Sequence, residues 1–566
     1  MKTAPPVKVM IASVLAIALS LTSCATPAPP LTPTPAPTPA PSPTPTPTPA
    51  PAPKPPPTTS GPYGELRIAL SSFGSERMDP IKGASSDVWN LLTPMLDHLT
   101  GKGVGEPAPE IAERWEMAPD GLSWIYHIRK GIKFHNGEEL KADDVKFSLD
   151  RWTSKDAFYG YLREMVERVE LVDEYSVRVY TKGTQPYLVI NAGSFADPPQ
   201  GIIMPKDYIE QRGMAYFERS PAGSGPFRFA RHIVGDLIQY EAVVDHWRQT
   251  PSFKKLTTIL MPEETSRVAA LKTGEIDAID VSLEAGRELE ASGLARLRTL
   301  NTTAVIIQLH GAYEPKAAGM PISDIRVRQA LSLAVDRDEI RKIFFYGKAD
   351  PPLPPFQTPV VAAADVDFPY WLSYAAKAYR YSPDEAKRLL KEAGYSQGFS
   401  IKLWTYPMAG SPYLTKLAEV IQGYWLKIGV KAEVVPVDIG AYNAIRNVTK
   451  SQSPDLMGQA ATYRYSASAV APKNLNTGFY STGSFGLLGK SMPEIDKLLN
   501  DAMSETNPVK RRDILAKIIK AGIDSYTALQ LCQAPTVAAL GPRVDIDIVP
   551  PAYIPLFADR AKHRKE

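Results

Sequence analysis

The chain holds 566 residues, which is too many for one compact domain and indicates two or three. Apolar residues make up 44% and charged residues 22%, and a net charge of only +3 argues against a nucleic-acid-binding protein, which would carry clustered lysine and arginine. Of the two cysteines, Cys24 and Cys532, only one remains in the body if Cys24 is processed, so a disulfide framework and a cysteine-based zinc site are excluded.

The first 24 residues have the pattern of an export signal. Two lysines precede residues 9–21, an uncharged and mostly apolar stretch that is too short to span a bilayer but suits the core of a signal peptide. The stretch ends in Leu21-Thr22-Ser23-Cys24, which resembles the lipobox of bacterial lipoproteins, where the cysteine becomes the acylated first residue. The alternative is an ordinary signal peptide with a chance cysteine. We expect a signal peptide over residues 1–23 and lipidation of Cys24.

A proline-rich segment follows and occupies residues 24–61. Seventeen of the 54 prolines lie between Ala25 and Ser60. Their alternating Thr-Pro and Ala-Pro steps remove backbone donors and favour an extended polyproline II tether over a fold. An anchored protein needs such a spacer, which favours the lipidated alternative. Because no other stretch approaches 18 apolar residues, we expect an exported body that is tethered to the membrane without spanning it.

From residue 61 onward the sequence predicts alternating strands and helices. Alternating or continuous apolar runs predict strands over residues 66–70, 237–244, 276–281, 401–406 and 430–437. Capping residues and apolar faces predict helices over residues 263–272, after Ser323, after Asp336, from Ser382 to Gly394 and over 412–428. This rhythm predicts an α/β architecture with a mixed sheet in the second half.

Residues 109–152 carry the most specific pattern in the chain. They predict a hairpin turn at Asp120-Gly121, a second turn at Asn136-Gly137 and a helix that opens with Asp143-Asp144. Related motifs follow at Ser224-Gly225-Pro226-Phe227 with Asp245-His246-Trp247, at Leu271-Lys272-Thr273-Gly274-Glu275-Ile276-Asp277, and at Arg326-Val327-Arg328-Gln329-Ala330. As a set, these motifs resemble the family 5 extracellular solute-binding proteins, the dipeptide, oligopeptide and nickel receptors of ABC importers.

The resemblance implies a fold and an organisation for the body. The fold would be the two-lobed α/β fold of periplasmic binding proteins, in the large type II variant of family 5 with mixed sheets and a hinge between the lobes. The implied segments are residues 62–106 and 223–312 as the two parts of lobe I, 107–222 as an extra subdomain packed on lobe I, 313–528 as lobe II, and 529–566 as a C-terminal return to lobe I.

The resemblance also implies a function. A lipid-anchored receptor on the outer face of the cytoplasmic membrane would capture a peptide or another small organic solute and deliver it to ABC permease subunits by closing its lobes. We expect a monomer that needs no cofactor and binds no nucleic acid. The alternatives are a solute sensor or adhesion lipoprotein of the same fold, and a hydrolase built on the fold.

Aromatic side chains in the second half are the candidate ligand-binding residues. Trp404 and Tyr406 alternate on one side of a predicted strand, and Tyr463, Arg464 and Tyr465 follow in a segment predicted to be irregular. Rigid aromatic rings with polar tips suit a ligand cleft of broad specificity. Core packing is the alternative for Trp404 and Tyr406, whereas an arginine between two tyrosines is a poor core element.

Thr462 bears on the charge of the solute. In dipeptide-binding relatives, a loop after a Met-x-Gly stretch offers an aspartate to the ammonium group of the ligand, and Thr462 falls at that position after Met457-Gly458. No acidic residue lies between Asp455 and Glu494, although a buried ammonium group needs a carboxylate partner. A guanidinium favours carboxylate, phosphate or carbonyl groups. We therefore expect a longer or blocked peptide, or an anionic or neutral organic molecule, held by the arginine and tyrosines named above.

Metal and enzyme chemistry are disfavoured. His127 and His135 lie in the hairpin region, but both belong to the structural signature. Asp143 and Asp144 are neighbours on a helix, so their side chains point about 100° apart, and an acidic helix start explains them. The sequence contains no motif of a serine hydrolase, a P-loop protein or a zinc peptidase. We therefore predict neither an enzymatic activity nor a metal site.

Overall fold

The computed structural model describes residues 61–83, 88–102, 106–158, 160–193, 200–359, 361, 364–406, 413–437, 442, 454–466, 469–481, 486–488, 492–547 and 554–564. Cys24, the predicted signal peptide and nearly all of the proline-rich segment lie outside the described residues. Among the helices that are described, none is long and apolar enough to cross a membrane.

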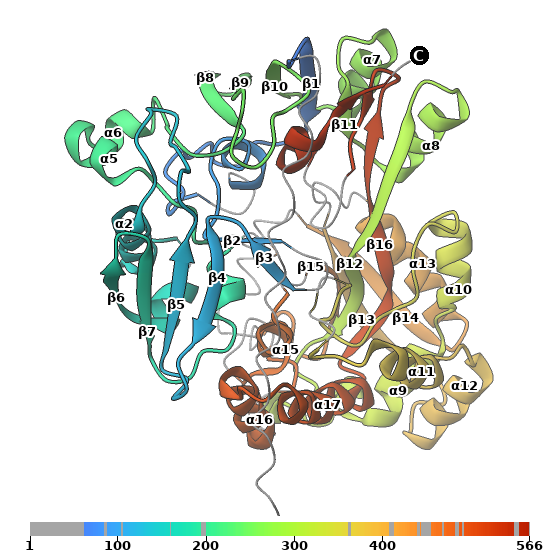
Figure 1. Ribbon diagram of the computed structural model, residues 1–566. Helices are drawn as coiled ribbons and strands as arrows, with labels where there is room; N and C mark the ends of the chain where they lie inside the picture. Colours follow the sequence, from blue (N-terminus) through green and yellow to red (C-terminus); the bar gives the residue numbers. More distant parts are fainter. Residues whose placement is uncertain are drawn as a thin grey trace, which may run out of the picture. The chain divides into compact units, whose positions relative to one another are not determined.

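A ten-stranded mixed sheet lies at the centre of the body, with the spatial order β14-β13-β15-β12-β16-β11-β1-β10-β9-β8 (Figure 1). The bounds are β1 (Glu65–Leu70), β8 (Phe227–Ile233), β9 (Leu237–Ala242), β10 (Lys255–Leu260), β11 (Ala278–Asp280), β12 (Arg296–Leu309), β13 (Phe399–Thr405), β14 (Val430–Pro436), β15 (Ala460–Ser466) and β16 (Ala528–Leu540). Strand β1 is parallel to β10 and β11, and β13 is parallel to β14 and β15. The predicted α/β class is confirmed, but the mixed sheet extends through both halves of the chain.

Strands β12 and β16 continue the sheet from one half to the other. The beginning of β12, from Arg296 to Leu300, pairs with the end of β16 beside β11. From Thr303 onward, β12 pairs with the beginning of β16 on one side and with β15 on the other. The register shifts between Leu300 and Thr303 and again between Val305 and Ile306. Such bulges bend and twist a strand, and the first one lies where the two parts of the sheet meet.

A separate four-stranded antiparallel sheet has the order β4-β5-β7-β6, and its strands are β4 (Ala112–Met117), β5 (Ser123–Ile128), β6 (Val166–Asp173) and β7 (Ser176–Thr181). The predicted turn joins β4 to β5, where Leu122 N donates to the Asp120 carboxylate over 2.9 Å and Gly121 has a φ of +72°. Strands β2 (Thr100–Lys102) and β3 (Pro107–Pro109) pair nearby, and short β17 (Val544–Asp545) pairs with β18 (Lys562–His563).

Helices flank both sheets. In the first half they are the π-helix η1 (Val88–Leu92), α2 (Ala142–Thr153), α3 (Tyr161–Met165), α4 (Leu188–Asn191), α5 (Lys206–Arg212), α6 (Met214–Phe217), α7 (Glu264–Thr273) and α8 (Leu283–Ala291). In the second half they are η2 (Pro315–Ala317), η3 (Pro321–Ser323), α9 (Ile325–Leu333), α10 (Arg337–Glu339), η4 (Ile340–Phe344), α11 (Phe368–Ala378), α12 (Pro383–Glu392), α13 (Leu414–Leu426), α15 (Ala471–Phe479), α16 (Pro493–Ser504), α17 (Pro508–Ser525) and η5 (Ile554–Arg560).

Most predicted helix ends are confirmed, and one is wrong. Helix α7 ends at Gly274, which adopts the left-handed conformation with a φ of +74°, and Asp336 caps α10 by accepting a bond from Glu339 N. Helix α9 is capped by Asp324 instead of Ser323, because the Asp324 carboxylate accepts from Arg326 N over 2.8 Å. Ser323 belongs to the preceding 3-10 turn, η3.

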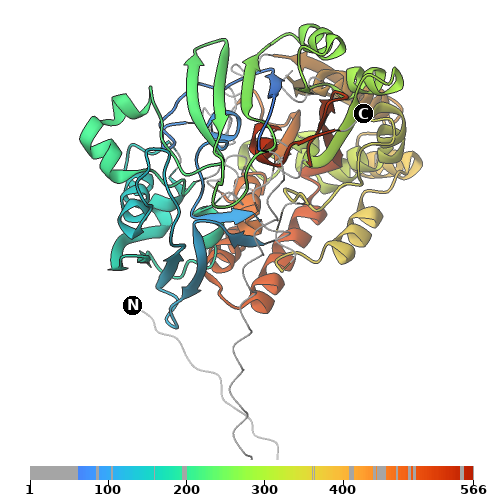
Figure 2. The same ribbon diagram turned by 45° about the horizontal axis from the view of Figure 1, so that its top comes forward.

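Two large hydrophobic clusters and a smaller one form the core. One large cluster combines the second half of β12 with β13, β15 and helices α9 to α17. The other combines β1, the four-stranded sheet and the C-terminal residues Ile554, Phe557 and Ala561. The hairpin of β8 and β9, drawn in green, forms the opposite edge of the large sheet from β14 (Figure 2).

Candidate functional site

Three neighbouring strands of the second half end at the same edge of the sheet. Strands β13, β14 and β15 are parallel and end at Thr405, Pro436 and Ser466. In α/β proteins, ligands bind in the crevice outside the carboxyl ends of such strands. We therefore take the side chains at these ends as the candidate functional site.

Aromatic rings gather at this edge. The ring of Tyr406, which directly follows β13, stacks on Tyr442 with 4.6 Å between centroids and meets Tyr463 edge-on at 6.4 Å. Trp404 lies two residues earlier, with the Lys402 ammonium group 5.8 Å from its ring. Tyr406 and Tyr442 are fully buried, Trp404 nearly so, and Tyr463 is partly exposed. The rings of Tyr406, Tyr442 and Tyr463 are thus in contact, and Trp404 lies near Tyr406 in the chain. Tyr463 is the most exposed of the four side chains.

The prediction of an irregular segment around Tyr463 is wrong, because Ala460–Ser466 form strand β15. The strand arises from long-range pairing with β12, in which Tyr463 lies opposite Ile306 and Tyr465 opposite Ala304. Alternation along a strand then places Tyr463 and Tyr465 on one face. The hydroxyl of Tyr465 donates to Asn474 Oδ1 over 3.0 Å.

The same alternation places Thr462 and Arg464 on the other face. Thr462 is fully buried, and its hydroxyl bonds Thr405 Oγ1 over 2.9 Å. Arg464 is partly exposed, and no described residue forms a hydrogen bond or ion pair with its guanidinium. The six predicted residues therefore come together at one edge, but on two faces of the sheet. A solute that touches Tyr463, Arg464 and Tyr465 together has to lie across the carboxyl end of β15.

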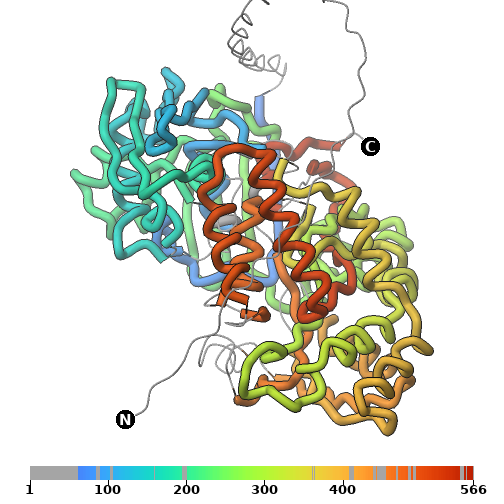
Figure 3. The backbone as a smooth tube through the Cα atoms, turned by 90° about the horizontal axis from the view of Figure 1, so that it is seen from below, coloured from blue at the N-terminus to red at the C-terminus, as the bar shows by residue number. Residues whose placement is uncertain are grey.

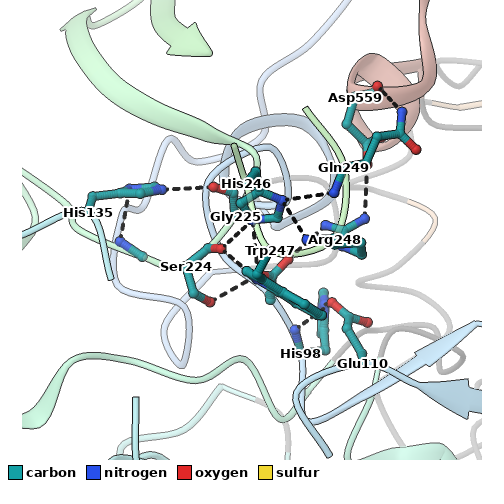
Figure 4. A network of polar contacts seen from close by, with 12 residues as sticks. His98, Glu110, His135, Ser224, Gly225, His246, Trp247, Arg248, Gln249 and Asp559 are labelled. Carbon is teal, nitrogen blue, oxygen red and sulfur yellow. Dashed lines mark hydrogen bonds and ion pairs between the residues drawn. The ribbon is translucent and has the colours of Figure 1, made fainter. Parts of the chain in front are cut away.

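Part of the sequence signature, the Ser224-Gly225 and His246-Trp247 motifs together with His135, meets elsewhere in a buried polar network (Figure 4). Its centre is the Asp97 carboxylate, which accepts from Arg248 over 2.8 Å, from Ser224 Oγ over 3.0 Å and from Trp247 Nε1 over 3.1 Å. Arg248 also pairs with Asp559 of η5 over 2.9 Å. Burial opposes ionisation of Asp97 and is the largest single effect, but the charges of Arg248 and His246 and the hydrogen bonds from Arg248 and Ser224 together outweigh it and lower the pKa of the carboxyl group. This network joins distant segments of the chain, and the positive charge of Arg248 lies between the carboxylates of Asp97 and Asp559.

Close backbone packing accompanies the network. A Cβ atom on Gly225 would lie 2.5 Å from the carbonyl carbon of Met95, which explains the glycine of the Ser-Gly-Pro motif. His135 is held by the same turn: Gly223 N donates to its Nδ1 over 3.2 Å, and its Nε2 contacts Gly225 O at 2.9 Å. Among the described residues, no three His, Cys, Asp or Glu side chains are placed to hold a metal ion.

His135 is held as a neutral ring. Although the residue is partly exposed, both nitrogens face backbone partners, and desolvation lowers the pKa of His135 from 6.5 to about 4. Between these pH values the unfolded state binds more protons than the folded state, so stability falls as the pH drops from 6.5 towards 4 and is unaffected by this group above 6.5.

We predict that His135→Gln makes stability less dependent on pH in this window. The wild type should lose up to about 1.4 kcal/mol more per pH unit than the variant. Urea unfolding between pH 7 and pH 4.5 measures the difference. Lys133→Gln, an exposed change in the same turn region, should keep the wild-type slope. An identical slope for His135→Gln and the wild type would contradict the prediction.

Comparison with known proteins places these features in a family context. A family model described as bacterial extracellular solute-binding proteins, family 5 Middle, matches residues 106–486. The dipeptide-binding protein of Escherichia coli is 30% identical over 368 residues, which cover 60% of this chain and 65% of that relative. Heme-binding protein A of Haemophilus influenzae is 28% identical over 493 residues, which cover 81% of this chain and 84% of that relative.

A solved structure shares the fold. The ABC transporter-associated periplasmic binding protein DppA of Helicobacter pylori, in complex with the peptide STSA, matches with a TM-score of 0.65 at 23% identity, over 85% of this chain and 95% of that chain. The predicted two-lobed fold of periplasmic binding proteins is thereby confirmed. The proteins found are solute-binding proteins and not enzymes.

Proposed function

The chain belongs to the bacterial extracellular solute-binding proteins of family 5, and we propose that it captures a solute, most simply a peptide, and delivers it to an ABC permease. The observation that carries the proposal is the row of aromatic residues at the carboxyl edge of β13 and β15, beside the bulged β12 and β16 that connect the two parts of the sheet. Relatives named as dipeptide-binding and heme-binding proteins support capture of an organic solute.

The proposal is tested in two steps. Native mass spectrometry of freshly purified protein identifies a solute that is retained from the cell. Uptake of that solute is then measured in cells with and without this protein, and with and without the permease. Uptake that needs both supports delivery. Binding without any effect on uptake would instead support a sensor.

A buried contact between the two halves of the chain bears on lobe closure. The hydroxyl of Tyr187, just before α4, donates to Asp365 Oδ2 over 2.7 Å, and Arg511 Nε of α17 donates to Asp365 Oδ1 over 2.8 Å. Tyr187 is 2% and Asp365 1% exposed. Burial raises the pKa of Tyr187 well above its usual value. Asp365 and Arg511 both belong to the proposed lobe II, so their ion pair survives opening, whereas the Tyr187 bond breaks.

Helices α16 and α17 provide further contacts to the first half. Thr184 Oγ1 donates to Ser504 O over 2.8 Å, and the guanidinium of Arg511 lies 5.0 Å from the centroid of the Tyr187 ring. Figure 3 shows these helices, in red and orange, beside the blue-to-teal first half and next to the yellow helices of the second. A motion that separates the lobes has to break this interface, so the interface contributes to the energy of the closed state.

We predict that Tyr187→Phe shifts the equilibrium towards the open state. It removes one hydrogen bond to a charged group, so the apparent Kd of the identified solute should rise roughly 5- to 50-fold. The radius of gyration without solute should increase in X-ray scattering. Tyr208→Phe is the matched control, because the Tyr208 hydroxyl bonds Ser220 O within the first half. An unchanged Kd and an unchanged scattering curve would contradict the prediction.

We propose that a lipid on Cys24 holds the protein at the outer face of the cytoplasmic membrane. Cys24→Ala should abolish labelling by a fatty-acid probe and move the protein from the membrane fraction to the soluble fraction, because several acyl chains hold a protein far more firmly than one. Cys532→Ala is the control, since Cys532 is buried. Membrane fractionation that is unchanged in Cys24→Ala would exclude the anchor.

We further propose that Arg464, and not a free amine, fixes the charged end of the solute. Acetylating the N-terminus of a bound peptide should change its Kd by less than roughly threefold, because no carboxylate stands at Thr462. Amidating the C-terminus should weaken binding roughly 10-fold in the wild type and not at all in Arg464→Ala. Calorimetry on the four combinations measures this coupling. Submicromolar binding that needs the free amine and survives Arg464→Ala would overturn the assignment.

A further inference from the structure

One face of three adjacent strands in the second half combines tyrosines, alanines and glutamines. Residues directly opposite one another on antiparallel strands point to the same face. In the middle strand, β12, this face carries Ala304, Ile306 and Gln308. Their partners are Tyr465, Tyr463 and Ala461 on β15, and Gln533, Gln530 and Ala528 on β16.

A bulge in β16 creates this arrangement. Gln530 and Gln533 are three residues apart, so a regular strand would point them to opposite faces. The register shift between Val305 and Ile306 leaves Leu531 without a partner on β12, and Gln533 thereby returns to the face of Gln530. The bulge thus gathers two amide side chains beside Gln308.

The amide groups on this face are buried, and most of their nitrogen and oxygen atoms have no partner among the described residues. Gln308 and Gln530 are each 0% exposed, and so is Gln357, a residue outside the strands whose backbone carbonyl lies next to the Gln533 amide. Neither the nitrogen nor the oxygen of their side-chain amides has a hydrogen-bond partner among the described residues. Gln533, 1% exposed, reaches the Gln357 carbonyl only at 3.5 Å, and its own Oε1 is unpaired within the described part.

Trp404 extends the group on the next strand. It lies opposite Ala461 in the parallel pairing of β13 with β15, and Ala461 lies opposite Gln308. The indole Nε1 of Trp404 is buried and has no partner in the part of the chain that the structure describes. We name Trp404, Gln308, Gln357, Gln530 and Gln533 the glutamine site.

Unpaired amides in a protein interior are costly, because they have lost hydrogen bonds to water and gained none. The cross-strand neighbours of Gln308 are Ala461 on β15 and Ala528 on β16, and an alanine side chain offers no hydrogen-bond partner to the Gln308 amide. The partly exposed Tyr463 lies in the same row as Gln530, across Ile306. The glutamine site therefore combines unmet hydrogen-bonding capacity with the aromatic edge of the candidate functional site.

The chemistry of the site selects a class of ligand group. A carboxamide both donates and accepts, and an indole only donates. No ionised side chain belongs to the glutamine site: the Lys402 ammonium group, 5.8 Å from the Trp404 ring, is on an exposed residue, and Arg464 points to the other face of β15. A charged group placed there would lose its hydration without a counter-charge. An uncharged group that both donates and accepts, a carboxamide or a hydroxyl, satisfies the site.

We propose that the glutamine site binds an uncharged polar side chain of the solute, the carboxamide or hydroxyl of a peptide. This inference rests on the proposed function, and it adds a preference among peptides that neither the family nor the named relatives supply. The site and Arg464 would then contact different parts of one solute.

The test uses N-acetylated tripeptides of alanine that carry glutamine, serine, leucine, glutamate or lysine at each position in turn. Titration calorimetry should show glutamine or serine peptides binding roughly 10- to 100-fold more tightly than the leucine peptide of the same pattern. Gln530→Met and Gln308→Met should each reduce this preference to less than roughly threefold. Gln422→Met is the matched control, because the Gln422 amide on α13 already donates to Ala432 O over 2.7 Å.

The outcomes separate this inference from the proposed function. Peptides that bind without a preference for amide or hydroxyl, or with a preference that both methionine variants retain, would leave peptide binding intact and show that the glutamines hold water only. Binding of no peptide to the wild type would overturn both proposals. Thermal unfolding checks that each variant is folded. Because Gln308 and Gln530 lie on different strands, the test still stands if one of the two variants does not fold.

Discussion

The pairing of β12 with β16 is the interaction on which the rest of the structure depends. These strands, of 14 and 13 residues, form the only pair that continues the sheet from β1 and β11 on one side to β13 and β15 on the other in the described part of the chain. Both large hydrophobic clusters are built against them. Any motion of one part of the sheet against the other has to be absorbed here, and the shift between Leu300 and Thr303 supplies a local break in the ladder where it can occur.

The second shift in the same pair has a different consequence. Between Val305 and Ile306 the ladder gains one residue on β16, and this sets which side chains share a face with Gln308. Two neighbouring register shifts in one strand pair therefore have different effects. The first allows the sheet to bend, and the second brings polar side chains together on one face. Regular strands of the same sequence would direct Gln533 away from Gln530, since side chains alternate strictly between faces.

Local signals in the sequence account for much of the fold, because capping and alternation are short-range effects. These short-range effects predict the end of α7 at Gly274 and the start of α10 at Asp336. They do not predict strand β15, since its pairing with β12 joins residues more than 150 positions apart in the chain. For the same reason the aromatic edge was predictable as a set of residues, whereas its division between two faces was not. The glutamines within the otherwise apolar strand β16 can be seen in the sequence. Which side chains lie beside Gln530 follows only from the pairing register of β16 with β12.

The buried network around Asp97 explains why the family is easier to identify than the solute. Removing the Asp97 carboxylate would take the acceptor from Ser224 Oγ and Trp247 Nε1 and one counter-charge from Arg248, which would keep only Asp559 and Glu110 as acidic neighbours among the described residues. The Ser224-Gly225 turn, His246 and Trp247 serve this network and not the candidate functional site. The demands of the scaffold are thus independent of what is bound, so relatives named for dipeptide and for heme match the same chain. We therefore propose that selectivity resides in residues that the network does not constrain, at the carboxyl edge of β13 to β15 and on the glutamine face of β12 and β16.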